Sequence, residues 1–435
     1  MAVPLRAAEP KPDERFKADL LVVVAHPDDE TEIGAYLARA IFDEHKRVAV
    51  VFGTRGNSGG NEQGQEQAAA LGLEREIEAR TALAHFDVSH VWFLNGYDTP
   101  GQDVLDSLET WDHGDSLGRL VRIVRLTRPE VIATWLPHWV SGENHGDHQA
   151  AGVLATEAFD LAGDPTAFAE ELAAPRNRHD VSNLTEGLRP WQAQKLYFFS
   201  DAENTDFLKG RGPAYGAKEE SPSRHESYAR LAAEECAYHL TQGDSGQMAA
   251  DALKKNDLHN FETPVLFVLG KSLVRTSKTG DLFEGVSEQA LEYHAHPAYQ
   301  PERETKPAME LGGPWYFYRR FWQVHELDNL RDLVGPEILA QPGKLLTIPL
   351  VIENPTSTEL PVTLTIALPE GWEMVRHPEA EFTVAPHAEY GYTFAVKTST
   401  SQKGVQPIDI RAVSNKAIVG TVSIATGVNS SAMPQ

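Results

Sequence analysis

The sequence predicts a layered α/β domain with a mainly parallel sheet, followed by an antiparallel β-sandwich. Short apolar runs alternate with helix-compatible segments in the first part of the chain, which is typical of a parallel α/β fold. After Pro342 the pattern changes to short alternating segments separated by Pro- and Asn-containing turns, as in a small sandwich. With 435 residues, 41% of them hydrophobic, the chain can bury at least one large core and divide into two or three domains.

Continuous apolar runs mark the strands of the first part, because a strand buried on both faces needs no polar alternation. The runs are Leu20–Ala25, Arg47–Phe52, His90–Leu94 and Val131–Leu136, and two further runs at Lys195–Phe199 and Pro264–Leu269 extend the same sheet. Helix-compatible segments lie at Gln65–His85, Ser116–Leu126 and Ser227–Leu240. We therefore expect a flexible N-terminal segment over residues 1–18 and a Rossmann-like domain over residues 19–296.

The second part begins with aromatic residues and ends as a predicted sandwich. Residues 297–336 form a connecting segment rich in aromatic side chains, which we expect to pack as a bridge between domains, with ligand stacking as the alternative. Alternating segments at Leu346–Ile352, Val362–Leu368 and Tyr392–Val396 then predict an immunoglobulin-like antiparallel sandwich over residues 337–430.

The charge balance excludes several classes of partner. Asp and Glu number 63 against 39 Lys and Arg, which gives a formal net charge of −24. This charge repels phosphate backbones, so we expect no nucleic acid partner. No apolar run approaches the roughly 20 residues that span a bilayer, so we expect no membrane insertion.

The Ala- and Pro-rich opening resembles a segment that follows a removed export signal, which favours a periplasmic or extracellular protein over the cytoplasmic alternative.

A cluster of acids and one imidazole follows the first predicted strand. His26, Asp28, Asp29 and Glu30 lie within five residues, at the end of a strand where ligands bind in open α/β sheets. Holding these groups together costs free energy unless protons or a cation offset the repulsion between the acids. Because Cys236 is the only cysteine, a metal site here must use histidine and carboxylate ligands.

A second cluster, Glu143–His148, follows the fourth predicted strand. His145 and His148 are three residues apart and can reach one site. Since a catalytic zinc takes about three protein ligands, His26, Asp29 and His148 would supply a His-Asp-His set. Taken singly, a His-Pro-Asp run is more often a turn, and a His-x-x-His pair is more often a solvated helix face. Two such clusters at the ends of strands in one domain favour a metal site.

The two motifs resemble those of the PIG-L or LmbE-like deacetylases, which carry His-Pro-Asp-Asp-Glu early and His-x-Asp-His later. The resemblance includes Arg75 in an Arg-x-x-Glu-Ala helix and Asp98 in an acidic loop. It also includes His239–Gln242, similar to a late His-x-Ser-Gln motif with Thr241 in place of Ser. The resemblance implies zinc-dependent removal of the N-acetyl group from an N-acetylglucosamine-type sugar or glycoconjugate, with one zinc per chain.

Carried over by motif position, the resemblance implies that His26, Asp29 and His148 hold the zinc and that Asp28 is the general base. An adjacent carboxylate can accept a proton from a water molecule that zinc has acidified, so this role agrees with the chemistry that such a site needs.

The remaining motif residues have less defined roles. By the same resemblance, His145 either stabilises the oxyanion or protonates the leaving amine. Arg75 and Asp98 fall where substrate contacts are expected. The alternative for Arg75 is an ion pair with Glu78 or a neighbouring acid on its helix.

Two rival functions use other features of the chain. Gly56–Gly60 satisfies the Gly-x-Ser-x-Gly pattern, so a serine esterase with Ser58 as nucleophile is one alternative, although an elbow should join a strand directly to a helix. The other is a non-catalytic carbohydrate-binding protein, against which Asp28 argues because a binding site needs no general base. The Leu368–Trp372 turn resembles the NPCBM-associated sandwich modules of bacterial glycosidases, which favours an enzyme that acts on glycans.

Overall fold

The computed structural model divides the chain into two compact units, which are described separately. The first unit comprises residues 1–99, 106–137 and 147–296, and the second comprises residues 100–105, 138–146 and 297–435. The residues whose structure is described are 12–142, 145–172, 187–202, 204–243, 245–296, 305–400 and 404–428. Residues 1–11 of the predicted N-terminal segment therefore lie outside the described ranges.

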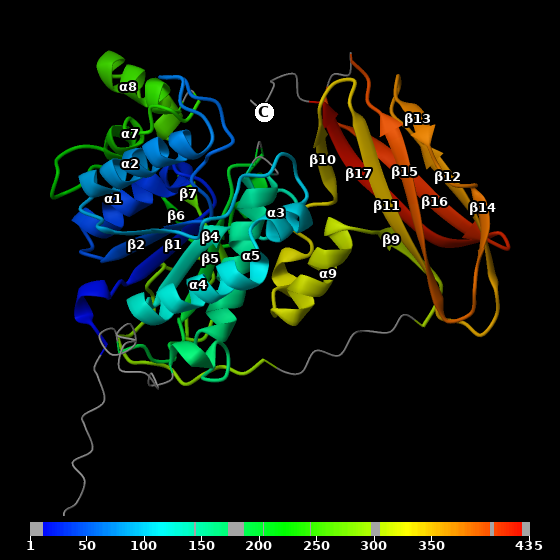
Figure 1. Cartoon of the computed structure of the whole chain (residues 1–435), viewed down its shortest axis with the longest axis horizontal. Helices are drawn as coiled ribbons and strands as arrows, with labels where there is room; N and C mark the ends of the chain where they lie inside the picture. The colour runs from blue at the N-terminus through cyan, green and yellow to red at the C-terminus, as the bar shows by residue number, and fades with distance from the viewer. Residues whose placement is uncertain are drawn as a thin grey trace, which may run out of the picture. The chain divides into compact units, whose positions relative to one another are not determined.

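A six-stranded sheet forms the centre of the first unit, in the order β3-β2-β1-β4-β5-β8 (Figure 1). The first five strands in this order are parallel, and β8 pairs antiparallel with β5. The strands are β1 Leu20–Val24, β2 Val48–Phe52, β3 His90–Phe93, β4 Val131–Trp135, β5 Lys195–Phe199 and β8 Val268–Ser272. β1, β2, β4 and β5 are buried at every position, as their continuous apolar runs predict.

Helices alternate with these strands. They are α1 Gly34–Phe42, α2 Ala69–His85, α3 Val104–Thr110, α4 His113–Thr127, α5 Gly146–Leu161, α7 Tyr228–Cys236 and α8 Ser245–Lys255. Right-handed crossovers place α1 and α2 on one face of the sheet and α4 and α5 on the other. The strand order reverses between β1 and β4, and the carboxyl ends of strands at such a point are where ligands bind in open α/β sheets.

Smaller elements complete the first unit. The 3₁₀ turns are η1 Glu14–Phe16, η2 Asp29–Ile33, η4 Ala169–Glu171, η5 Asp206–Leu208 and η6 His259–Phe261, and the short strands β6 Ala214–Tyr215 and β7 Val265–Leu266 pair antiparallel. The predicted helix Ser227–Leu240 ends at Cys236, and the residues after it turn back toward the end of β1. No helix in the described part of the chain is both long and apolar enough to cross a membrane.

The second unit is built on two packed sheets, in the orders β10-β17-β16-β12-β14 and β13-β15-β11-β9. All pairings are antiparallel except β10 with β17. The strands are β9 Ala308–Leu311, β10 Glu337–Ala340, β11 Leu345–Asn354, β12 Leu360–Ala367, β13 Glu373–Arg376, β14 Glu381–Val384, β15 Ala388–Lys397, β16 Gln406–Ser414 and β17 Ala417–Val428. Trp372 belongs to the hydrophobic core of this sandwich.

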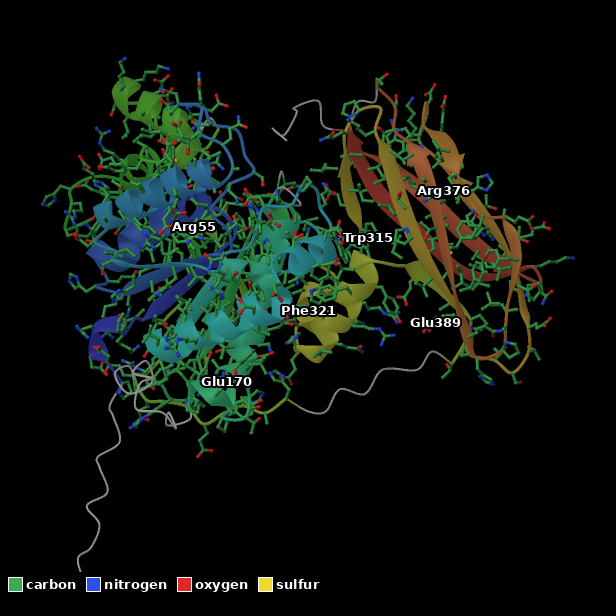
Figure 2. All side chains as sticks on the ribbon, in the orientation of Figure 1. Arg55, Glu170, Trp315, Phe321, Arg376 and Glu389 are labelled. Atoms are coloured by element: carbon green, nitrogen blue, oxygen red, sulfur yellow. The ribbon has the colours of Figure 1, made fainter. Side chains whose placement is uncertain are left out.

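The aromatic connecting segment forms a helix within the second unit. α9 spans Pro314–Val324, with Pro314 in its first turn, and η7 follows at Asp328–Leu330. Figure 2 shows Trp315 and Phe321 on this helix. Trp315 packs against the core of the sandwich. The predicted fold class, a Rossmann-like domain with a mainly parallel sheet followed by a β-sandwich, is confirmed.

A buried ion pair joins the amino ends of β1 and β4. The Lys17 ammonium group donates to both carboxylate oxygens of Glu130 at 2.7 Å and to the carbonyl oxygens of Ala18 and Arg128 at 2.8 Å. Both Lys17 and Glu130 are buried, so each charge depends on the other for its compensation.

We expect Lys17→Met to destabilise the first unit by about 3–5 kcal/mol, because it leaves the Glu130 carboxylate buried without a cation. Urea unfolding measures the change. The double variant Lys17→Met/Glu130→Leu should recover much of the lost stability, since it removes both charges. An unchanged unfolding midpoint in the single variant would contradict this account.

Candidate active site

Both predicted motifs lie at the carboxyl ends of the two central strands. His26 follows β1 by two residues, and Asp29 begins the 3₁₀ turn η2. His148 lies in the first turn of α5, which follows β4. Asp28, between His26 and Asp29, has a φ of 101°, a backbone conformation that non-glycine residues rarely adopt.

Three predicted ligand atoms converge in the first unit. His26 Nδ1 lies 3.2 Å from His148 Nε2 and 3.6 Å from Asp29 Oδ1, and His148 Nε2 lies 3.3 Å from Asp29 Oδ1. Ligands that are about 2.0–2.1 Å from a tetrahedral zinc are about 3.3 Å from one another, so the spacing suits such an ion. The donor set of two imidazole nitrogens and one carboxylate oxygen suits zinc as well. These residues therefore fit a metal.

The Asp29 carboxylate is oriented by its second oxygen. Oδ2 accepts the backbone N–H groups of Ala25 and His26 at 2.9 and 3.0 Å, and the indole N–H of Trp135 at 2.7 Å. Three donors on Oδ2 leave Oδ1 directed at the two histidines. The Trp135 ring also stacks on the His148 imidazole, with ring centroids 4.4 Å apart and planes 2° apart. Trp135 thus positions two of the three predicted ligands, a role that sequence reasoning did not assign.

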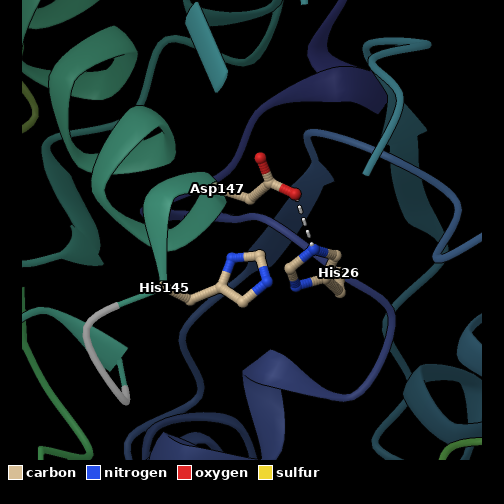
Figure 3. Close-up of side chains that lie close together, drawn as sticks. All are labelled: His26, His145 and Asp147. Carbon is tan, nitrogen blue, oxygen red and sulfur yellow. Dashed lines mark hydrogen bonds and ion pairs between the residues drawn. The ribbon is translucent and has the colours of Figure 1, made fainter. Parts of the chain in front are cut away.

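Asp147 orients the remaining ligand. Its Oδ2 lies 3.2 Å from His26 Nε2, the nitrogen on the far side of the ring from the other ligands (Figure 3). Thr99 holds this carboxylate by its backbone N–H at 2.9 Å and by its hydroxyl group. A carboxylate behind a ligating histidine fixes its tautomer and raises its basicity. The position of Asp147 between the two histidines of the second motif is the sequence signal for this role.

Hydrogen bonds and charges couple the pKa values of these side chains to one another. Burial lowers the pKa of His26, but its hydrogen bonds to Asp147 and Asp29 outweigh burial and raise that pKa well above its ordinary value. Burial raises the pKa of Asp29, but the charge and hydrogen bond of His148 lower it well below the ordinary value. The site therefore concentrates negative charge that protons or a cation must balance.

Asp28 lies beside these residues and belongs to no predicted ligand set. Burial, and then the charge of Asp29, raise the pKa of Asp28 to about 7. Its Oδ2 lies 3.4 Å from the hydroxyl of Ser245, its hydrogen-bonding partner at the start of α8. A carboxyl group with a pKa near neutrality is suited to accept and release a proton.

His145 lies one residue before α5 and two residues before Asp147, so the covalent chain keeps it at the start of that helix (Figure 3). Its backbone N–H donates to the carbonyl oxygen of Gly142 at 2.7 Å. Residues 143 and 144 of the second motif lie outside the described ranges.

Arg75 is buried and holds a loop in place. Its guanidinium donates to the carbonyl oxygens of Gly56, Gly60 and Thr241, the last two at 2.7 and 3.0 Å. Glu78, the alternative partner considered for Arg75, instead accepts the backbone N–H and hydroxyl of Thr241. Arg75 therefore joins the glycine-rich loop to the turn after α7.

Asp98 and Ser58 meet at the rim of the site. Asp98 Oδ2 accepts the backbone N–H of Ser58 at 2.7 Å, and its Oδ1 lies 4.0 Å from His26 Nε2. Ser58 is exposed in a turn six residues after β2, and α2 begins only at Ala69. This loop lacks the tight strand-to-helix turn of a serine hydrolase elbow.

A His-Asp-His set at the reversal point of a parallel sheet defines the first unit as an α/β domain with a candidate metal centre. Residues 21–159 match the family model described as PIG-L, GlcNAc-PI de-N-acetylase. This range contains both motifs, so the resemblance stated from the motifs is confirmed for this part of the chain.

Curated relatives match the same part of the chain. A 1D-myo-inositol 2-acetamido-2-deoxy-alpha-D-glucopyranoside deacetylase from Streptomyces avermitilis is 34% identical over 183 residues, which are 38% of this chain and 58% of that protein. A protein from Catenulispora acidiphila with the same name and the suffix 1 is 32% identical over 172 residues, which are 36% of this chain and 52% of that protein. The chain spans about half the length of these relatives.

Among solved structures, an N,N'-diacetylchitobiose deacetylase from Pyrococcus horikoshii is similar at 17% identity and a TM-score of 0.38, covering 58% of this chain and 84% of that one. A conserved protein from Thermus thermophilus is similar at 21% identity and a TM-score of 0.39, covering 60% of this chain and 97% of that one.

We expect Arg75→Met to loosen the glycine-rich loop, because the carbonyl oxygens of Gly56, Gly60 and Thr241 lose a charged donor. Cleavage by a glutamyl endopeptidase after Glu62 should become about 10- to 100-fold faster, as the loss of about 1.5–3 kcal/mol in charged hydrogen bonds implies. Arg80→Met is the control, because Arg80 lies on the same helix but bonds to Glu76 and the carbonyl of Val91. Equal cleavage rates in the wild type and Arg75→Met would exclude the clamp.

Proposed function

We propose that this protein is a zinc-dependent hydrolase that removes the N-acetyl group from an N-acetylglucosamine-type sugar or glycoconjugate. The observation that carries the proposal is the convergence of His26, Asp29 and His148, with Asp28 beside them and outside the ligand set. The printed names of the curated relatives, deacetylases of a 2-acetamido-2-deoxy sugar, support the substrate class.

His26, Asp29 and His148 would hold one zinc ion. When bound, zinc supplies a Lewis acid that polarises the amide carbonyl and lowers the pKa of a water molecule to about 7. Trp135 and Asp147 keep the ligands in place through the contacts described above. This arrangement orients Asp29 and His26 before a metal arrives, so less ordering is needed on binding.

Asp28 is the proposed general base. Its carboxylate accepts the proton of the attacking water as the new C–O bond forms. The same proton, or one from His145, goes to the amine nitrogen as the C–N bond breaks, which yields acetate and the free amino sugar. His145 serves either as this acid or as the donor that stabilises the oxyanion.

Arg75 and Asp98 are proposed to act at the substrate side of the site. Asp98 lies in the loop after β3 and accepts the backbone N–H of Ser58 in the glycine-rich loop, so it can set the position of that loop against a sugar. Arg75 acts on the same loop from the inside through Gly56 and Gly60.

Two alternatives are separated by one assay. Acetate release is measured on a panel of N-acetylated sugars, oligosaccharides and glycopeptides, with and without a chelator. We expect release that the chelator abolishes and that Ser58→Ala retains. Activity that resists the chelator and disappears in Ser58→Ala supports the serine esterase, whereas sugar binding without acetate release supports the carbohydrate-binding protein.

The metal prediction concerns occupancy. Purified protein should contain about one zinc per chain, and His26→Ala and His148→Ala should each lose most of it, because the site has only three protein ligands. His113→Ala is the matched control, since His113 pairs with Glu157 away from the motifs. Metal analysis of the wild type and the three variants tests this prediction. Full zinc occupancy in both His26→Ala and His148→Ala would contradict the ligand assignment.

The base prediction concerns Asp28→Asn, which keeps the shape of the side chain but cannot accept a proton at neutral pH. We expect zinc to remain bound and kcat to fall by roughly 10²–10⁴-fold, the usual contribution of a positioned general base. Steady-state kinetics and metal analysis on one preparation test both parts. Near wild-type turnover with zinc in place would remove Asp28 from the role and direct attention to Glu30 or Asp147.

A further inference from the structure

A second cluster of ionisable groups lies in the first unit behind the first motif. Glu30, Glu235 and His239 are each fully buried. His239 Nε2 lies 3.0 Å from Glu30 Oε1 and 3.7 Å from Glu235 Oε1. Glu235 lies in the last turn of α7, and His239 follows in the turn after it, so both come from sequence more than 200 residues after the motif. The proposed function assigns no role to Glu235 or His239, and it names Glu30 only as a substitute if Asp28 is not the base.

Glu30 links this cluster to Asp28. Its Oε1 meets His239, and its Oε2 accepts the backbone N–H of Asp28 at 3.0 Å. A carboxylate bonded through both oxygens to partners on opposite sides cannot rotate without losing one of them. His239 therefore determines whether Glu30 can hold the Asp28 amide.

Asp28 needs such support because of its backbone. At a φ of 101° this residue lies in the left-handed region, which an aspartate leaves unless the surroundings hold it there. Thr31 contributes from the other side, since its hydroxyl donates to the carbonyl oxygen of Asp28 at 2.6 Å. The N–H and the C=O of the strained residue are thus both bonded.

The turn after α7 and the first residue of α8 contact the same loop at two further points. The Gln242 side-chain amide donates to the carbonyl oxygen of Pro27, and the Ser245 hydroxyl lies 3.4 Å from Asp28 Oδ2. Together with His239, these contacts bind the segment from Pro27 to Glu30 at three positions. The metal ligands His26 and Asp29 instead make their supporting contacts with Trp135 and Asp147.

We propose that His239, backed by Glu235, is a positioning residue that holds Asp28 in its strained conformation through Glu30. The assignment of Asp28 as a base rests on the proposed function, but the structural link does not. Loss of His239 frees the Glu30 carboxylate, the Asp28 amide loses its acceptor, and the Asp28 side chain turns away from the reacting water. The ligand set keeps its own supports and retains its metal.

The experiment compares three substitutions of His239. His239→Leu removes the donor, and His239→Asn stays polar but is too short to reach Glu30, which guards against a failure of the apolar variant to fold. His239→Gln keeps an N–H at similar reach and should rescue the function. Lys271→Met is the stability control, because it breaks another buried ion pair of this unit, with Asp160 at 2.6 Å.

Three quantities are measured on each protein: amide hydrogen exchange of the peptide over residues 24–33, zinc content, and kcat and KM for acetate release. We expect faster exchange at Asp28 and a kcat lower by about 10- to 100-fold in the Leu and Asn variants, the cost of misplacing a catalytic group by about 1 Å. KM and zinc content should stay unchanged. The Gln variant and Lys271→Met should resemble the wild type in exchange and kcat.

The outcomes separate this proposal from the proposed function. If the wild type releases no acetate from any substrate, the function fails, and the exchange measurement alone decides whether His239 holds Asp28. Unchanged exchange and kcat in the Leu and Asn variants overturn the proposal. Loss of zinc in parallel with kcat also overturns it, because the cluster would then support the ligands and not the base.

Discussion

The geometry of the site depends on one carboxylate, Asp29, whose two oxygens have different partners. Asp29 Oδ2 accepts two backbone N–H groups at the end of β1 and the indole N–H of Trp135 at the end of β4. The two central strands are therefore joined at their carboxyl ends through one side chain, whose other oxygen faces His26 and His148. The register of β1 and β4 therefore brings the residues that hold Asp29 to the same edge of the sheet.

The surroundings of the two adjacent aspartates also shift their pKa values in opposite directions. Burial raises the pKa of Asp29, but the charge and hydrogen bond of His148 lower it well below its ordinary value, whereas burial and then the charge of Asp29 raise the pKa of Asp28 to about 7. Two carboxyl groups whose environments push their pKa values apart are suited to different tasks, one to hold a cation and the other to move a proton.

Much of this architecture could be predicted from local sequence, and the rest could not, for definable reasons. Buried parallel strands appear as continuous apolar runs, and both motifs are short, so β1, β4 and the location of the clusters followed from the pattern. Trp135, Thr99 and His239 could not be assigned roles, because their contacts depend on strand pairing and on a turn that returns from far along the chain. From sequence alone, a tryptophan at the end of a strand is predicted only to be a core residue. In the structure, the indole N–H of Trp135 donates to the Asp29 carboxylate. Arg75 illustrates the same limit, since helix periodicity predicts neighbours on one helix, while its partners are carbonyl oxygens of two distant loops.

The second unit draws its packing from three parts of the sequence, which bears on whether the C-terminal region is a separable module. His138 is fully buried and stacks on Trp322 of α9 with ring centroids 4.9 Å apart, and burial lowers its pKa to about 3, so it packs as a neutral ring. Trp139 donates its indole N–H to the carbonyl oxygen of Gly335 at 3.0 Å. The chain that leaves β4 therefore enters this unit before it returns at α5 with the second motif. Without α9, His138 and Trp139 lose the rings of Tyr318 and Trp322 as aromatic partners. The aromatic segment is therefore part of the packing of the second unit.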